Sequence, residues 1–123
     1  MTLGLFLSLA GDILWIIGLS VMAGISRKAL AKIPKGVSVP MLWDAKRMVV
    51  WRAPRMVGVA LLVVMALVGG LVLLWLARTA DTLQAQTIWF GVRALIAPLL
   101  ALAHVTHMKR ALQTLGAEGR LIP

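Results

Sequence analysis

Residues 26–55 read SRKALAKIPKGVSVPMLWDAKRMVVWRAPR and form the one long polar segment of an otherwise apolar chain. The segment holds eight of the thirteen basic residues and a single acidic one, Asp44. The apolar runs on its two sides are each long enough to cross a bilayer. Because short loops rich in Lys and Arg stay on the cytoplasmic side, the segment is predicted to be the cytoplasmic loop of a membrane protein.

The composition of the whole chain supports the membrane class. A hydrophobic content of 61% is too high for a soluble core of 123 residues, and the length allows one domain, residues 1–123. The formal net charge of +9 could indicate nucleic-acid binding, but the basic residues flank apolar spans, so no nucleic acid is expected. The charge predicts attraction to anionic lipid headgroups instead. The absence of cysteine excludes disulfides and thiolate metal sites.

Three apolar runs predict three transmembrane helices, at Thr2–Ser26, Met56–Ala77 and Leu83–Thr106. The positive charges of the first run follow its apolar stretch, the reverse of a cleavable signal peptide, so it is expected to remain as a helix. This helix is expected to continue past Ser26 through the basic residues until Pro34 and Gly36 stop it. The turn at Thr79–Thr82 is so short that the second and third helices must be antiparallel neighbours. The residues after Gly116 are expected to form a loose end.

The distribution of charge then predicts the orientation. Eleven of the thirteen basic residues lie in the loop or in the C-terminal tail, which predicts an N-terminus outside and a C-terminus inside. The expected protein is an all-α, multi-pass integral membrane protein of the bacterial inner membrane, with a basic cytoplasmic loop.

Within the loop, apolar residues alternate on both sides of a turn at Asp44–Arg47. This pattern predicts a short hairpin on the membrane surface, with indole rings at headgroup level. An interfacial helix from Met41 to Trp51 is the alternative, although Pro40 weighs against it. The loop residues expected to contact lipid or a partner are Trp43, Lys46, Arg47, Trp51, Arg52 and Arg55.

The motifs at Lys32–Pro34, Val39–Asp44 and Trp51–Arg55 resemble the N-terminal domain of unknown function of SdpI-type membrane proteins, over about residues 10–75. In that family a first helix is followed by an Ile-Pro, a Val-Pro, an aromatic residue and an Asn-Gly-like turn before the second helix. This chain lacks the polar residue before the aromatic, and Ala45–Arg47 stand where the turn glycine would be. The resemblance implies a multi-helix inner-membrane protein, involved in immunity or signalling in the best-known members and without established catalysis.

Small residues mark one face of the first helix. Gly4, Gly11 and Gly18 recur every seven residues and would let another helix approach closely. That neighbour could belong to this chain or to a partner subunit.

Two charges lie inside the predicted spans, Asp12 and Arg93. Each lies ten residues from the outer start of its helix, a depth of about 15 Å at 1.5 Å per residue. An isolated charge at mid-membrane costs at least about 2.5–3.5 kcal/mol, so the two are predicted to form an ion pair between the first and third helices. The rival interpretations are that Arg93 faces a partner's carboxylate or a cofactor, or that Asp12 carries a proton.

His104 and His107 are the remaining candidate ligands. Residues three apart lie about 60° from each other around a helix, so they cannot be both axial ligands of one haem. Either could ligate a haem or bacteriochlorophyll of a partner, hydrogen-bond a headgroup, or simply mark where the helix leaves the membrane. With no third ligand nearby, no metal or cofactor is expected.

The sequence contains no recognisable catalytic pair. Its four carboxylates are spread over three depths of the predicted topology, so an enzyme is not expected. The first functional hypothesis is a non-catalytic accessory or assembly subunit of a larger energy-transducing complex, photosynthetic or respiratory. The alternative is an SdpI-like stand-alone protein for immunity or signalling. Three short helices bury few faces against one another, which favours the subunit.

Overall fold

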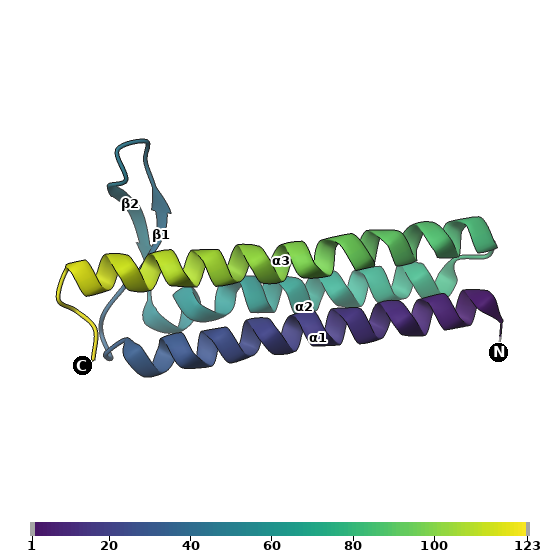
Figure 1. Ribbon diagram of the computed structural model, residues 1–123, viewed down its shortest axis with the longest axis horizontal. Coiled ribbons are helices and arrows are strands. Elements are labelled where there is room, and N and C mark those ends of the chain that lie inside the picture. The colour runs from purple at the N-terminus through teal and green to yellow at the C-terminus, as the bar shows by residue number, and fades with distance from the viewer. Residues whose placement is uncertain (1, 123) are drawn as a thin grey trace.

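The computed structural model describes residues 2–122 and shows three long helices side by side, with a β-hairpin near one end (Figure 1). All three helices are long and apolar enough to cross a membrane, which indicates a multi-pass membrane protein. The chain begins at the end of the bundle where α2 meets α3, named here the turn end, and finishes at the opposite, hairpin end. The elements in chain order are α1 (Leu3–Lys32), β1 (Val39–Trp43), β2 (Val49–Ala53), α2 (Arg55–Thr79) and α3 (Leu83–Ala117).

The helix bounds agree with the sequence patterns for α1 and α2 but not for α3. Helix α1 continues past Ser26 to Lys32 and stops just before Pro34, and α2 begins directly after Pro54. The predicted end of the third helix near Thr106 is wrong, because α3 runs on to Ala117. Beyond the apolar run a stripe of buried residues at helical spacing packs this extension against α1 and the hairpin, and it consists of Met108, Ala111 and Leu115.

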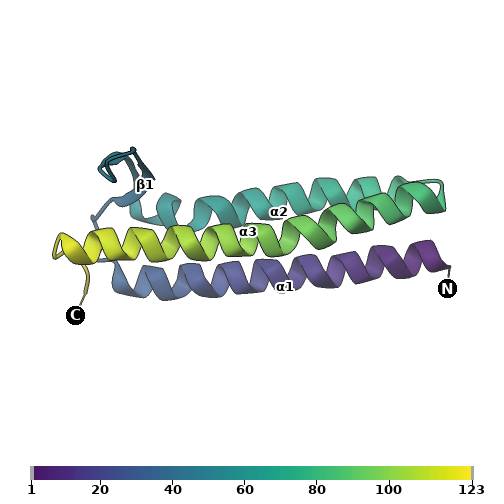
Figure 2. The ribbon, with the colours of Figure 1, turned by 45° about the horizontal axis from the view of Figure 1, so that its top comes forward.

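The glycine stripe of α1 faces α3 of the same chain. A Cβ at Gly11 would overlap the guanidinium of Arg93, and one at Gly18 would touch the backbone of Ala97. Gly4 meets a glutamine of α3 in the same way. The close neighbour left open by the sequence is therefore intramolecular, and Figure 2 shows α1 and α3 running together along the bundle. The stripe is used inside the chain and does not form an exposed interface.

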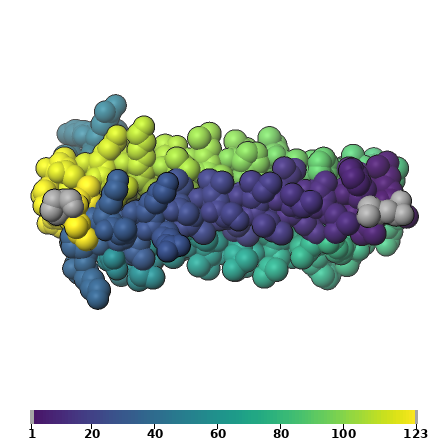
Figure 3. Space-filling view, turned by 60° about the horizontal axis from the view of Figure 1, so that its bottom comes forward, coloured from purple at the N-terminus to yellow at the C-terminus, as the bar shows by residue number. Residues whose placement is uncertain are grey.

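Helix α2 is joined to α1 by one buried indole. The Nε1 of Trp15 donates a hydrogen bond to the carbonyl of Ala66 at 3.0 Å, and the ring lies against Gly70. A glycine is needed there because the indole occupies the space that a Cβ would take. Figure 3 shows α1 (purple to blue) lengthwise between α2 (teal) and α3 (green).

The predicted hairpin is confirmed, and the alternative interfacial helix is wrong. Strands β1 and β2 pair antiparallel with two register irregularities. The Asp44 Oδ1 accepts hydrogen bonds from the backbone N–H groups of Lys46 and Met48, both at 2.9 Å, and so closes the turn. Arg47 takes the left-handed conformation with φ 62°. In Figure 1 the hairpin projects sideways from the helices.

The C-terminal residues that the structure describes are not a loose end, contrary to the prediction. The backbone N–H of Ile122 donates to the carbonyl of Lys32 at 2.9 Å, and Leu121 packs against the core at the hairpin end. The tail therefore folds back over the end of α1. It satisfies one of the carbonyls that the last turn of a helix leaves without an intrahelical partner.

Two adjacent glycines of α2, Gly69 and Gly70, offer a test of the packing of Trp15 against that helix. We expect Gly70→Ala to lower the free energy of unfolding by about 1–3 kcal/mol, because the new methyl displaces Trp15 and its hydrogen bond. Gly69→Ala is the matched control, since nothing lies within 4 Å of a Cβ there. It should leave stability unchanged or slightly higher. Thermal unfolding in detergent measures both, and equal effects of the two changes would contradict the packing.

Candidate functional site

The predicted ion pair between Asp12 and Arg93 is present. The Arg93 Nη1 lies 2.5 Å from the Asp12 Oδ1, and the Arg93 Nη2 donates to the carbonyl of Ser8 at 2.7 Å. The Arg93 side chain is 2% exposed, whereas that of Asp12 is 20% exposed. The pair therefore fixes α3 against α1 with the guanidinium inside the bundle.

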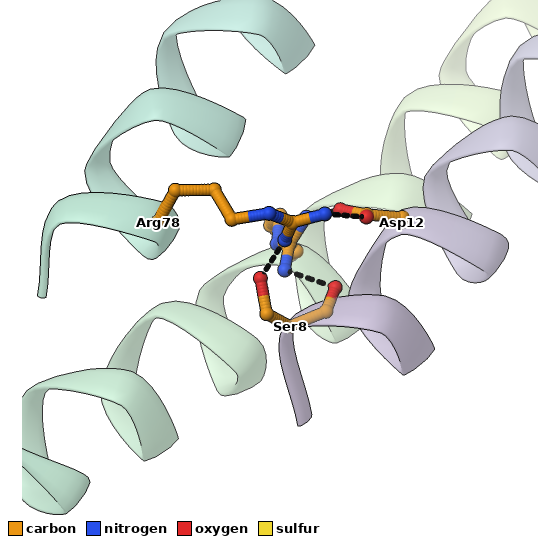
Figure 4. A network of polar contacts seen from close by, with 4 residues as sticks. Ser8, Asp12 and Arg78 are labelled. Carbon is orange, nitrogen blue, oxygen red and sulfur yellow. Dashed lines mark hydrogen bonds and ion pairs between the residues drawn. The ribbon is translucent and has the colours of Figure 1, made fainter. Parts of the chain in front are cut away.

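A second arginine joins the same carboxylate. The Arg78 Nη2 lies 2.5 Å from the Asp12 Oδ2, and its Nη1 donates to the hydroxyl of Ser8 (Figure 4). The sequence pattern did not predict this contact, because Arg78 lies in the last turn of α2, far along the chain from Asp12. Side chains on a helix lean toward its N-terminus, so Arg78 leans away from the turn end while Arg93, on antiparallel α3, leans toward it. The two guanidiniums therefore converge on Asp12 from opposite directions.

This cluster of Ser8, Asp12, Arg78 and Arg93, named here the ion cluster, carries two positive charges and one negative charge. Arginine keeps its proton in proteins, so deprotonation cannot remove the excess charge. The Nε of Arg93 is also buried without a hydrogen-bond partner among residues 2–122. The ion cluster therefore has an excess positive charge and an unused donor within the helical bundle.

The ion cluster opens into a groove between α1 and α2. The groove has a volume of about 240 Å³ and contains Asp12 and Arg93 at its polar end. Its walls are otherwise apolar, with Ile16 60% and Leu71 59% exposed. An occupant of this groove would meet a long hydrocarbon surface and, at one end, the guanidinium of Arg93.

His104 lies in the core and does not face a partner. Its Nε2 is 2.7 Å from the hydroxyl of Ser26, and that hydroxyl also contacts the carbonyl of Val59. A carbonyl can only accept, so the single hydroxyl proton goes to Val59 and the His104 Nε2 must donate to Ser26. The contact joins all three helices, and at 1% exposure His104 cannot be reached by a partner's cofactor.

His107 and Trp43 hold the hairpin against α3. Their rings meet edge to face at 5.8 Å, and the Arg110 guanidinium lies 4.4 Å from the centre of a Trp43 ring. The Trp43 Nε1 donates to the Thr114 hydroxyl at 3.2 Å. Trp43 is thus tied to α3, while Trp51 on the other strand is 51% exposed.

The four basic residues of the hairpin and its junction with α2 divide into two groups. Arg55 donates to the carbonyls of Ile33 and Leu30, both at 2.8 Å, and so caps the C-terminus of α1. Arg52 forms a 2.5 Å ion pair with Glu118. Lys46 and Arg47 are exposed in the hairpin turn. Arg52 and Arg55 thus stabilise the fold, whereas Lys46 and Arg47 remain available for contacts outside it.

The acidic residues are held at separate places. Asp12 belongs to the ion cluster, Asp44 closes the hairpin turn and Glu118 binds Arg52. Over residues 2–122 the structure brings no three His, Cys, Asp or Glu side chains together as a metal site. The ion cluster and its groove are therefore the candidate site with the strongest geometric support.

The charge balance of the ion cluster is testable by comparing two substitutions. Asp12→Asn leaves two guanidiniums without a counter-charge, so we expect the free energy of unfolding to fall by about 3 kcal/mol. Arg78→Gln leaves the neutral Asp12–Arg93 pair intact and should cost less than about 1 kcal/mol, since Arg78 is 38% exposed. Unfolding in mixed detergent measures both. A larger loss for Arg78→Gln than for Asp12→Asn would contradict this assignment.

Comparison with family models, curated proteins and solved structures found no match to this chain. The resemblance to SdpI-type proteins therefore stays a prediction. The function has to be argued from the geometry of the ion cluster, the groove and the hairpin.

Proposed function

We propose that the protein is a non-catalytic subunit of a larger membrane complex, and that a transmembrane helix of a partner lies in the groove between α1 and α2. The observation that carries this proposal is the excess positive charge of the ion cluster at the polar end of that groove. A carboxylate or other acceptor on the partner helix would supply the missing negative charge.

The energetic cost of the excess positive charge depends on where that charge lies. Charged side chains inside a membrane protein pair with one another or face the bundle interior, because lipid cannot solvate them. Asp12 is shared by two guanidiniums, so each receives only part of its charge. The groove is long and apolar on both sides, which suits a helix more than a small polar ligand.

We propose that the complex lies in the bacterial inner membrane with the hairpin end in the cytoplasm. The support is that the loop and the C-terminal tail meet at one end of the bundle, so their basic residues are concentrated there. Arg78 and Arg93, the two basic residues outside this group, belong to the ion cluster.

An energy-transducing complex, photosynthetic or respiratory, remains the narrower form of this proposal. His107 is only half-buried, so it is the histidine that a pigment or haem of a partner would approach. His104 is excluded from that role by its burial. In the alternative of a stand-alone, SdpI-like protein, lipid chains would occupy the groove.

A tryptophan introduced into the groove should distinguish a subunit of a complex from a stand-alone protein. We expect Leu71→Trp to block a partner helix, because Leu71 lines the groove and its larger replacement would fill it. Val72→Trp is the matched control, since Val72 is 53% exposed on the same helix and lies outside the groove. Mass measurement after gentle extraction from the native membrane should give a larger species for the unchanged protein and for Val72→Trp, and a loss of that species for Leu71→Trp.

Two results would overturn the subunit proposal. One is a lone species near 13.3 kDa for the unchanged protein, which would favour the stand-alone alternative. The other is a larger species that survives Leu71→Trp as well as it survives Val72→Trp, which would place the partner on another face.

The orientation has its own test. A reporter that is active only outside the cytoplasm should be inactive when fused after Pro123 and active when inserted at Asp81, in the turn between α2 and α3. The opposite pattern would show that the basic end faces outward. Both fusions should be checked for equal accumulation.

A further inference from the structure

Two hollows meet where the hairpin crosses α3, and they share Trp43, Thr106 and Arg110. One has a volume of about 530 Å³ and is lined mainly by apolar side chains, including Leu99 and Leu102. The other has a volume of about 460 Å³ and is lined by polar and basic side chains, including Arg47 and Lys109. They adjoin at these three shared residues, and the two together are named here the hairpin slot.

The order of the two hollows along α3 matches the order of a membrane. Helix α3 starts at the turn end, so Leu99 and Leu102 lie nearer the middle of the bundle and Lys109 nearer its hairpin end. Leu102 and Lys109 are about 10 Å apart along the axis at 1.5 Å per residue. In a membrane-spanning bundle the apolar hollow would face the hydrocarbon layer, and the basic hollow would lie beyond it at headgroup level.

All the charged residues that line the hairpin slot are basic. Arg47, Lys109 and Arg110 line the basic hollow, and no carboxylate lines either hollow. Glu118, the acidic residue near this end of α3, is already paired with Arg52. His107 lines the apolar hollow and keeps a buried Nε2 without a hydrogen-bond partner in the described chain. The slot thus offers three cations to a ligand.

The backbone of the hairpin turn provides an independent observation. Arg47 adopts φ 62°, a left-handed conformation that favours Gly or Asn and that a long L side chain rarely takes. The three-residue loop of the hairpin requires a left-handed residue here, because the Arg47 N–H donates to the carbonyl of Asp44 and the Asp44 N–H donates to that of Met48. Here the side chain of Arg47 lines the basic hollow, so the strained turn positions a cation at the hairpin slot.

We propose that the hairpin slot binds one anionic phospholipid. Its phosphate lies between Arg47, Lys109 and Arg110, and an acyl chain runs along Leu99 and Leu102. His107 lines the slot between these regions. This site lies on α3 and the hairpin, away from the groove between α1 and α2, and does not depend on the partner proposed for that groove.

The test is retention of phosphatidylglycerol, compared with phosphatidylcholine, by the full chain in mixed micelles, measured by native mass spectrometry. We expect preferential retention of one phosphatidylglycerol. Arg47→Gly and Lys109→Gln should each weaken it about fivefold, the effect of one basic residue near an anionic headgroup. Lys28→Gln is the matched control, because it removes a positive charge from α1 near the same end but outside the slot.

A second measurement separates binding from folding. Arg47→Gly relieves the left-handed strain, so its thermal unfolding temperature should be equal to or above that of the unchanged protein while its lipid binding falls. Equal retention of the two lipids, or the same loss for Lys28→Gln as for Lys109→Gln, would overturn the proposal. So would displacement of phosphatidylglycerol by millimolar inorganic phosphate, which would indicate a site for the free anion alone.

Discussion

The packing of the three helices depends on the burial of one guanidinium, that of Arg93. An arginine cannot escape the membrane by losing its proton, so its charge must be matched where it lies. Asp12 provides the match, the carbonyl of Ser8 accepts a further hydrogen bond, and Gly11 leaves the space in which the guanidinium lies. These requirements fall within two turns of α1, which explains why its small and polar residues gather on the face toward α3. Helix α2 is then tied to the same carboxylate through Arg78.

Counting depth along the helices was sufficient to predict the contact between Asp12 and Arg93, because both lie the same number of residues from the turn end. It could not predict Arg78, whose Cα lies at the end of α2. The contact exists because an arginine side chain is long and leans toward the start of its own helix. That direction is a general property of helices and could have been applied to the sequence. The missing information was which face of α2 meets α1, and this depends on the fit of Trp15 against Gly70.

At the hairpin end, too, the sequence pattern predicts some features of the fold, and only tertiary packing determines the others. Alternating residues on both sides of Asp44 were sufficient to predict the hairpin, and Pro34 the end of α1. The extension of α3 to Ala117 was not predicted, because the apolar run gives way to Lys109 and Arg110 soon after Thr106. A charged pair on a helix ends only the membrane-embedded part, since the opposite face can continue to pack. Met108, Ala111 and Leu115 form that face and bury the hairpin's first strand against the bundle.

The two ends of the bundle both carry excess positive charge, but its physical consequence differs. In the ion cluster the excess is held among helices, where low polarity makes an unmatched charge costly and a helix with a carboxylate would be favoured. At the hairpin slot Lys109 and Arg110 are exposed, so water can solvate them and their charge requires no partner for stability. The strained conformation of Arg47 is therefore not explained by a need to balance charge within the fold. It is set by the hairpin turn, in which the Arg47 N–H donates to the carbonyl of Asp44 and the Asp44 N–H donates to the carbonyl of Met48. Its consequence is that a third cation is held beside Lys109 and Arg110, where a negative ligand would meet all three.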